Sequence, residues 1–468
     1  MAIKLSLIIF TSLLLIHSCI ARQNGLREQQ ECNFERINAL QPSSSIESEG
    51  GRTEFFNPDQ KQFRCAGVAF LKHTIRQKGL FVPSYTNSVL MVFVEQGRGF
   101  YGLVIPGCAE TFQSPQDQRG DRPRDRHQRV HRFKKGDMLI IPAGVAHWIY
   151  NNGDQDVQLV VMFDTTNRVN QLDSIPQRFF VLGNPQGQKQ QGQQEQPLIQ
   201  QFQGDSVLKA FDAESLVNAF KVNSEMGRKL NGENVKQGHI IIVEKELQLE
   251  IPDRQHQEGE EEERQQEQEQ GQGKGRGNGI EETSCSVRIR TNLDNIDRAD
   301  FYNPQAGHLI SLNSHHLPIL ADVRLSAERG HLRKHAILAP HWVLNAHSII
   351  YATNGEARIQ IVNNQGQQVF NERLQKGQLV LVPQNFAVMI QAGSQGFRWV
   401  SFKTNDNAMI TPIAGRGSVF RGLPVSVLAN ILQISEEQAS NLKYSNAETM
   451  LFVPQRQPRA ENFVRMLV

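Results

Sequence analysis

Several features that would point to a particular partner or chemistry are scarce in this 468-residue sequence. The formal net charge is only +2, so the chain as a whole gives no case for nucleic acid or an anionic membrane as a partner. Only five residues are cysteine, and no two of them have the spacing of a zinc site. The hydrophobic content of 39% and the charged content of 21% are those of a soluble globular protein with polar insertions.

Sequence motifs of catalysis are equally scarce. No glycine-rich phosphate loop follows a strand pattern, and the G-x-S-x-G sequence that presents a nucleophilic serine does not occur. No N-x-Ser/Thr sequon is present, so we expect no N-linked glycan. These absences count against nucleotide-dependent enzymes and serine hydrolases.

Residues 1–21 have the pattern of a secretory signal peptide. Lys4 precedes an apolar stretch at residues 5–16, and small residues follow up to Ala21. We expect cleavage between Ala21 and Arg22. A membrane anchor is a weaker interpretation because the apolar run is too short to cross a bilayer, and no later run is long enough.

Two pairs of segments repeat along the chain. Residues 134–149 resemble residues 375–390, and in both an apolar strand pattern begins after a glycine and reaches a proline. Residues 206–230 resemble residues 418–443, with apolar residues three and four apart as in amphipathic helices. A Gln-rich insertion at 186–204 explains most of the difference in spacing. The sequence therefore predicts a tandem duplication of strands followed by helices.

A linker with a candidate cleavage site lies between the copies. Residues 253–279 lack the apolar residues that would offset the entropy of ordering, so we expect disorder there, and the segment ends at Asn278–Gly279. Proteases cut exposed, flexible backbone. A cut would leave an acidic piece, 22–278, with 31 basic and 34 acidic residues, and a basic piece, 279–468, with 18 and 14. Asn354–Gly355, by contrast, falls between two strand patterns, where we expect a tight turn.

Four cysteines remain after signal removal, an even number that favours two disulfides in an oxidising compartment. They are Cys32, Cys65, Cys108 and Cys285. Sequence alone leaves all three pairings open, and Cys285 could also be a free buried thiol. Since only Cys285 lies beyond Asn278, any bridge between the two pieces has to use it.

One motif identifies the fold. The sequence "GDMLIIPAGVAHWIYN" resembles the second cupin motif at each of its fixed positions, which are Gly136, Pro142, Gly144, His147 and Asn151. The resemblance implies a mainly β fold of two tandem cupin barrels, each a double-sheet jelly roll followed by a small helical segment.

From this pattern we expect a particular domain organisation. An N-terminal cupin module would occupy residues 22–252, and the linker with its processing site would follow at 253–279. A C-terminal cupin module would occupy residues 280–468.

Metal-binding cupins carry three histidines and a glutamate at four positions, a set suited to a divalent ion. In the first copy these positions fall on Ser84, Thr86, Leu90 and His147. In the second copy they fall on His341, Val343, Ser348 and Val388. One imidazole per copy remains, so we expect no metal, no other cofactor and no catalytic residue. His147 and His341 are then interpreted as hydrogen-bonded barrel residues.

A narrower resemblance covers nearly the whole mature chain. Residues 32–70, 79–88 and 278–309 resemble the N-terminal module and the processing region of the 11S globulins, the legumin-type seed storage proteins. The resemblance implies a nutrient reservoir without catalysis, held in the protein storage vacuole of the seed.

The family also implies processing and assembly. An asparagine-specific endopeptidase would cut between Asn278 and Gly279, and disulfides would join Cys108 to Cys285 and Cys32 to Cys65. Homotrimers would form and pair into hexamers after cleavage. We expect the trimer contacts at edge strands and at the apolar faces of the helices around 206–230 and 418–443.

Two alternatives stay open. The first is a cupin metalloenzyme, which metal bound in near-stoichiometric amount would support. The second is a small-ligand-binding module at the barrel mouth around Ser84, Tyr85, His147 and Trp148. A barrel filled by its own side chains would count against that second alternative.

The expected cut can be tested on protein from its native tissue. Electrophoresis with reductant should split one band into chains covering 22–278 and 279–468, the shorter one beginning at Gly279, whereas without reductant the disulfide should hold them together. A chain that runs intact under both conditions would mean either an uncleaved precursor or an Asn278 that serves only as a turn.

Overall fold

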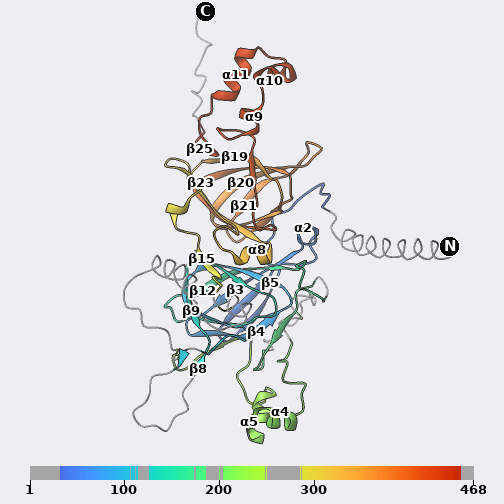
Figure 1. Cartoon of the computed structure of the whole chain (residues 1–468), viewed down its shortest axis with the longest axis vertical. Helices are drawn as coiled ribbons and strands as arrows, with labels where there is room; N and C mark the ends of the chain where they lie inside the picture. The colour runs from blue at the N-terminus through green and yellow to red at the C-terminus, as the bar shows by residue number, and fades with distance from the viewer. Residues whose placement is uncertain are drawn as a thin grey trace, which may run out of the picture. The chain divides into compact units, whose positions relative to one another are not determined.

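The computed structural model describes residues 32–105, 107–110, 112–113, 126–172, 175–185, 200, 204–247, 249, 285 and 287–454. They belong to two compact units (Figure 1). Unit 1 draws on Met1–Asn33, Gln41–Asp294 and Ser314–Arg324, and unit 2 draws on Phe34–Leu40, Asn295–Asn313 and Leu325–Val468. The expected signal cleavage site and Asn278–Gly279 lie outside the described residues.

Two antiparallel sheets form unit 1, which we call the first barrel. The first sheet has the order β1 (Ser44–Ser48), β2 (Gly51–Phe55), β3 (Val68–Ile75), β12 (Val157–Asp164), β5 (Val89–Gln96), β10 (Asp137–Ile141) and β15 (Arg290–Asn292). The second has the order β13 (Arg178–Phe180), β4 (Gly79–Thr86), β11 (Ala146–Tyr150), β6 (Arg98–Val104) and β9 (Val130–Lys134), with β14 (Ile240–Ile242) also on β4. A separate pair joins β7 (Phe112–Gln113) and β8 (Arg126–His127). The apolar run of β5 is buried along almost its full length, as expected for a strand in the core.

Unit 2, the second barrel, is one continuous antiparallel sheet. Its main path is β16 (Phe301–Asn303), β17 (Gly307–Leu312), β18 (Ser326–Leu332), β23 (Ala387–Lys403), β19 (Ile337–Val343) and β24 (Ile410–Pro412). The long β20 (Ser348–Val362) pairs with β23, β21 (Gln368–Gln375) and β22 (Leu379–Val382), and β25 (Leu451–Phe452) pairs with β19.

The prediction of a tight turn at Asn354–Gly355 is wrong. β20 runs through both residues as one strand, and its pairing with β23 shifts register on either side of them. Gly355 has φ of 70°, a conformation that favours glycine, so the pair forms a bulge that bends the strand. In the first copy the chain does divide here, into β5 and β6.

The boundary between the units differs from the expected one at residue 280. Strand β15 pairs with β10 in unit 1, from Asp137 opposite Asn292 to Leu139 opposite Arg290. In Figure 1 this yellow strand lies among the blue and green strands of unit 1. Conversely, Leu40 exchanges backbone hydrogen bonds with Leu379 in unit 2. Strand pairing, rather than order along the chain, decides which unit a segment joins.

The helical segments expected at 206–230 and 418–443 are present. The helices of the described residues are α2 (Lys61–Ala66), α4 (Ala213–Phe220), α5 (Ser224–Leu230), α8 (Ile319–Val323), α9 (Val419–Gly422), α10 (Val425–Leu432), α11 (Glu436–Tyr444) and the 3₁₀ turn η1 (Ile296–Arg298). No helix in this part of the chain is long and apolar enough to cross a membrane.

The two copies end and begin their helices alike. Lys221 and Gln433 both have φ of 53° at the end of a helix. Two residues later, Asn223 and Ser435 both cap the next helix by accepting a backbone N–H bond. The duplication inferred from sequence therefore extends to single backbone conformations.

Candidate functional site

The four cupin ligand positions of the first copy lie inside the first barrel. Ser84 and Thr86 lie on β4, Leu90 on β5 and His147 on β11, and all four side chains are buried. The pairing of β11 with β4 places His147 opposite Ser84. Leu90 offers no ligand atom, and the Thr86 hydroxyl donates instead to the carbonyl oxygen of Ser88 at 2.6 Å.

A buried arginine occupies this cluster. Arg178, on β13, donates from its NH1 nitrogen to Ser84 Oγ at 2.7 Å, and the same nitrogen lies 3.2 Å from His147 Nε2. Its guanidinium carbon also lies 5.1 Å from the ring centre of Phe81 and 5.8 Å from that of Phe163. Burial lowers the pKa of Arg178 to about 9, which leaves the side chain charged at neutral pH.

Arg178 also determines the form of His147. Because a guanidinium can only donate, His147 Nε2 has to accept, and Nδ1 then carries the proton and faces the carbonyl oxygen of Val145 at 3.2 Å. Burial and the charge of Arg178 lower the pKa of His147 to about 3, against a small opposing effect of the Val145 hydrogen bond. His147 is therefore a neutral, hydrogen-bonded barrel residue, as we inferred from its isolation.

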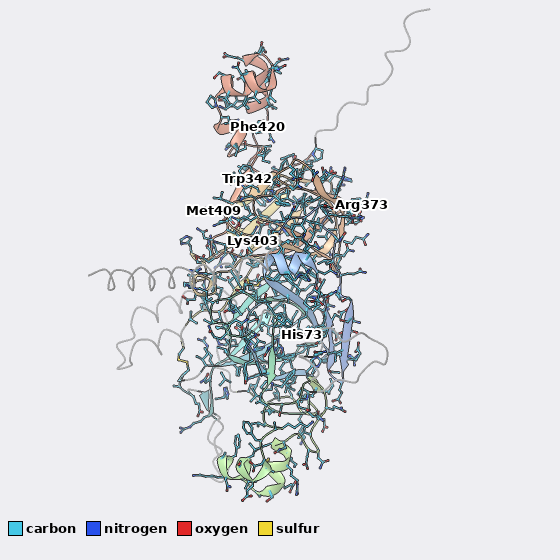
Figure 2. The ribbon with its side chains drawn as sticks, turned by 90° about the vertical axis from the view of Figure 1, so that its right-hand side faces the viewer. His73, Trp342, Arg373, Lys403, Met409 and Phe420 are labelled. Atoms are coloured by element: carbon cyan, nitrogen blue, oxygen red, sulfur yellow. A yellow bond between two sulfur atoms is a disulfide. The ribbon has the colours of Figure 1, made fainter. Side chains whose placement is uncertain are left out.

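Two further histidines line the same interior. Thr53 Oγ1 lies 2.8 Å from His73 Nδ1 and 2.7 Å from His239 Nε2, and Ser48 Oγ lies 3.2 Å from His239 Nδ1. Burial, followed by the charge of Arg178, lowers the pKa of His239 to about 3 and that of His73 well below 6.5. Figure 2 marks His73 within the strands of unit 1. Hydrogen bonds between barrel side chains thus satisfy these imidazoles.

In the second barrel, two of the four ligand positions are apolar. His341 and Val343 lie on β19, Ser348 on β20 and Val388 on β23, and strand pairing places His341 opposite Val388. His341 Nδ1 lies 2.8 Å from the carbonyl oxygen of Ala339, and burial is the main cause that lowers the His341 pKa.

A buried ion pair lies beside these positions. Lys403 Nζ on β23 lies 3.2 Å from Glu328 Oε2 on β18, with both side chains 5% exposed (Figure 2 labels Lys403). The same ammonium donates to Ser348 Oγ at 3.4 Å, and Ser348 Oγ lies 2.6 Å from Ser401 Oγ. Trp399 Nε1 donates to the other oxygen of Glu328 at 3.3 Å.

Neither set of residues fits the metal that the cupin fold often carries. Within the described part of the chain, no three histidine or carboxylate side chains converge inside either barrel. A fixed positive charge instead contacts ligand positions in both, Arg178 in the first and Lys403 in the second. These sites can hold internal hydrogen bonds, but they offer a divalent cation too few ligands, and in the first barrel the charge of Arg178 would repel it.

The residues of the proposed barrel-mouth ligand site divide between two faces. Ser84 and His147 are buried, whereas their neighbours Tyr85 and Trp148 are only partly buried, because side chains alternate along each strand. Tyr85 stacks on Phe179, with ring centres 5.1 Å apart. The four side chains therefore do not line one cavity.

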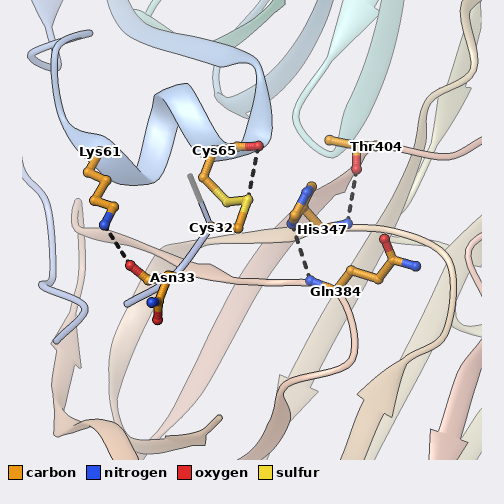
Figure 3. The surroundings of a disulfide bond; sticks show 7 residues. All are labelled: Cys32, Asn33, Lys61, Cys65, His347, Gln384 and Thr404. Atoms are coloured by element: carbon orange, nitrogen blue, oxygen red, sulfur yellow. Dashed lines mark hydrogen bonds between the residues drawn. A yellow bond between two sulfur atoms is a disulfide. The ribbon is translucent and has the colours of Figure 1, made fainter. Parts of the chain in front are cut away.

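The four cysteines form two disulfides within unit 1. Cys32 bonds to Cys65 and Cys108 bonds to Cys285, the pairs that the family resemblance implied. Figure 3 shows Cys65 in helix α2, where Lys61 Nζ donates to the carbonyl oxygen of Asn33 at 2.6 Å. The Cys108–Cys285 bond joins residues 177 positions apart.

Sequence reasoning located the ligand positions but missed the residues that fill them. Arg178, Lys403, His73 and His239 belong to no short motif. The available signal was a charged residue beside the strand-like run "RFFVL" (178–182) and another at the end of "FRWVSFK" (397–403), where solvent exposure would otherwise be expected.

Comparison with known proteins gives the class and then the family. The cupin family model matches residues 37–186 and again residues 291–440, so the chain is a bicupin. An 11S globulin seed storage protein of Anacardium occidentale is 44% identical over 94% of this chain and 96% of its own length. Legumin A of Gossypium hirsutum is 42% identical over 98% of this chain and 99% of its own length. The crystal structure of the coconut allergen cocosin matches with a TM-score of 0.78 at 39% identity, over 91% of this chain and all of that one.

The chain therefore belongs to the 11S globulin, or legumin, family of seed storage proteins. Its function is that of a storage protein, and the family is not one of enzymes. The expected fold of two tandem cupin barrels with attached helices is confirmed.

The buried imidazoles should make stability depend on pH. Unfolded chains bind a proton at histidine near pH 6.5, whereas folded His147 and His239 do so only near pH 3. The contribution of each of these histidines to the free energy of unfolding should therefore fall by about 1.4 kcal/mol per pH unit as the pH drops from 6.5 towards 3, and it should stay level above 6.5.

Urea unfolding at a series of pH values measures this dependence. His239→Gln should reduce its slope below pH 6.5 by about 1.4 kcal/mol per unit. An unchanged slope in His239→Gln would contradict the assignment.

Proposed function

We propose that this storage protein is made as a precursor, cut between Asn278 and Gly279 by an asparagine-specific endopeptidase, and deposited in the protein storage vacuole of the seed. The observation that carries the proposal is the Cys108–Cys285 disulfide, because its two cysteines lie on opposite sides of the proposed cut. Strand β15 adds a second connection, since it follows the cut in sequence and pairs with β10, which precedes it. A cut chain would keep both connections.

The composition supports storage of nitrogen. Glutamine occurs 49 times, almost as often as the 50 lysines and arginines together. Many of these glutamines lie in the polar segments 186–204 and 253–279. Such segments suit a protein that is kept and later digested.

Self-association is the second part of the proposal, as homotrimers that pair into hexamers after cleavage. The attached helices expose large apolar side chains in both units. In α4, α5 and the segment before them these are Phe211, Phe220 and Met226, and in α10 and α11 they are Val427, Ile431, Leu432, Leu442 and Tyr444. Exposed apolar clusters of this kind mark protein contacts. With one cluster in each unit, a head-to-tail contact between copies can close into a ring.

Asn278→Ala in the full precursor tests the processing step. Incubation with an asparagine-specific endopeptidase should cut the wild-type chain once in the linker, and Asn278→Ala should remove that product. Asn152→Ala, which changes an exposed asparagine that precedes a glycine outside the linker, should leave cleavage unchanged. An Asn278→Ala precursor that still gives a chain beginning at Gly279 would refute the assignment.

Ile431→Glu tests the assembly. Ile431 is 72% exposed on α10, and a buried carboxylate at a contact between copies should weaken association at least about tenfold. Light scattering should then report smaller particles with an unchanged melting temperature. Ser426→Glu places the same charge on an exposed position of the same helix, and its particles should keep the wild-type mass. Equal masses for both variants would place the contact elsewhere.

A further inference from the structure

In each barrel a cationic side chain contacts positions where a metal-binding cupin holds its ion, two of the four in the first barrel and one in the second. In the first barrel, the Arg178 NH1 nitrogen is 2.7 Å from Ser84 Oγ and 3.2 Å from His147 Nε2, and both residues are ligand positions. In the second, Lys403 Nζ is 3.4 Å from Ser348 Oγ.

The remaining polar atoms of a former metal site need a new partner. A buried imidazole nitrogen or hydroxyl without a hydrogen bond is costly, and a metal ion would normally take the lone pairs that face it. Here these lone pairs accept hydrogen bonds from N–H groups of the chain itself. His147 shows this most directly, because its Nε2 lone pair accepts from Arg178 while its Nδ1 faces a carbonyl oxygen.

The two cations reach their barrels from different strands. Leu90 and Ser348 are equivalent ligand positions, and the sheet places Phe163 opposite Leu90 and Lys403 opposite Ser348. Lys403 thus stands where the first barrel has Phe163. The first barrel brings its cation from β13 instead, and the Arg178 guanidinium lies 5.8 Å from the Phe163 ring centre. Both barrels therefore have a positively charged side chain in this region, but on non-equivalent strands. Inheritance of one residue from a common ancestral copy would not explain this.

The groups that stabilise the positive charge also differ between the two barrels. Lys403 is compensated by Glu328, which lies 3.2 Å away and is equally buried. The Arg178 guanidinium lies over the aromatic faces of Phe81 and Phe163, which attract a cation through their ring electrons. Both environments are suited to a permanent cation rather than to an exchangeable ion.

We infer that Arg178 and Lys403 are built-in replacements for the cupin metal. Arg178 donates to Ser84 and His147 and repels any divalent cation, whereas Lys403 donates to Ser348 and forms an ion pair with Glu328. The barrels are then sealed cores stabilised by an internal cation. This inference concerns the barrel interiors and holds whether or not the chain is cut at Asn278.

Rebuilding the ligand set in the first barrel tests the inference. In the full chain, Ser84→His, Thr86→His and Leu90→Glu would restore three ligands beside His147. With Arg178 retained, this triple variant should bind little Co²⁺. Adding Arg178→Met should allow it to bind about one equivalent per chain, at least about tenfold more, as measured by elemental analysis after dialysis and by visible absorption.

Arg132→Met is the matched control. Arg132 is an exposed arginine whose guanidinium carbon lies 5.6 Å from the Phe100 ring centre, so it also contacts an aromatic face but lies outside the barrel interior. In the triple variant, this change should not increase Co²⁺ binding. Equal cobalt content in folded triple variants with and without Arg178 would overturn the inference.

A second measurement applies if the rebuilt variants do not fold. Arg178→Ala in the otherwise native chain should leave a space beside Ser84 and His147 that accepts a free guanidinium ion. Low millimolar guanidinium chloride should then raise the melting temperature of Arg178→Ala above that in equal sodium chloride, with no such rise in the wild-type chain. No difference between the two salts would overturn the assignment of a cation site.

Discussion

The hydrogen bonds of Arg178 with Ser84 and His147 are the constraint around which the first barrel is arranged. A charged group in a closed interior has to be surrounded by acceptors and aromatic faces, and the neighbouring imidazoles have to remain neutral. Burial and the charge of Arg178 keep His73 and His239 neutral, and Thr53 lies within hydrogen-bond distance of both. The cost of charging these histidines inside the barrel also connects the interior to the pH dependence of folding.

A second arrangement concerns which parts of the chain build each unit. Strand β15 and Cys285 lie in unit 1 although they follow the linker, and Phe34–Leu40 lies in unit 2 although it precedes the first barrel. Each unit thus depends on chain from both sides of the proposed cut. Backbone pairing and a covalent bond would both resist separation of the two pieces, which suits a protein that has to survive processing and storage in a compact form.

The duplication explains why the copies agree in backbone and differ in side chains. Gly136 and Gly377 occur at equivalent positions with φ of 86° and 84°, because the turn before the following strand requires that conformation in both barrels. Interior side chains are less constrained, since several combinations fill the same space. The first barrel uses an arginine with aromatic faces, and the second uses Lys403 with Glu328.

The sequence by itself determined the two barrels, the paired helices and the loss of the metal ligands, because repeats, helical spacing and motif positions are local patterns. It did not determine that Asn354 lies within a continuous strand, or that Trp148 and His147 face opposite sides. Nor did it place Arg178 against Ser84, which lies 94 positions away. Those results depend on strand register, since a shift of one residue exchanges the two faces of a strand. Only the tertiary structure fixes that register, by joining segments far apart in the chain.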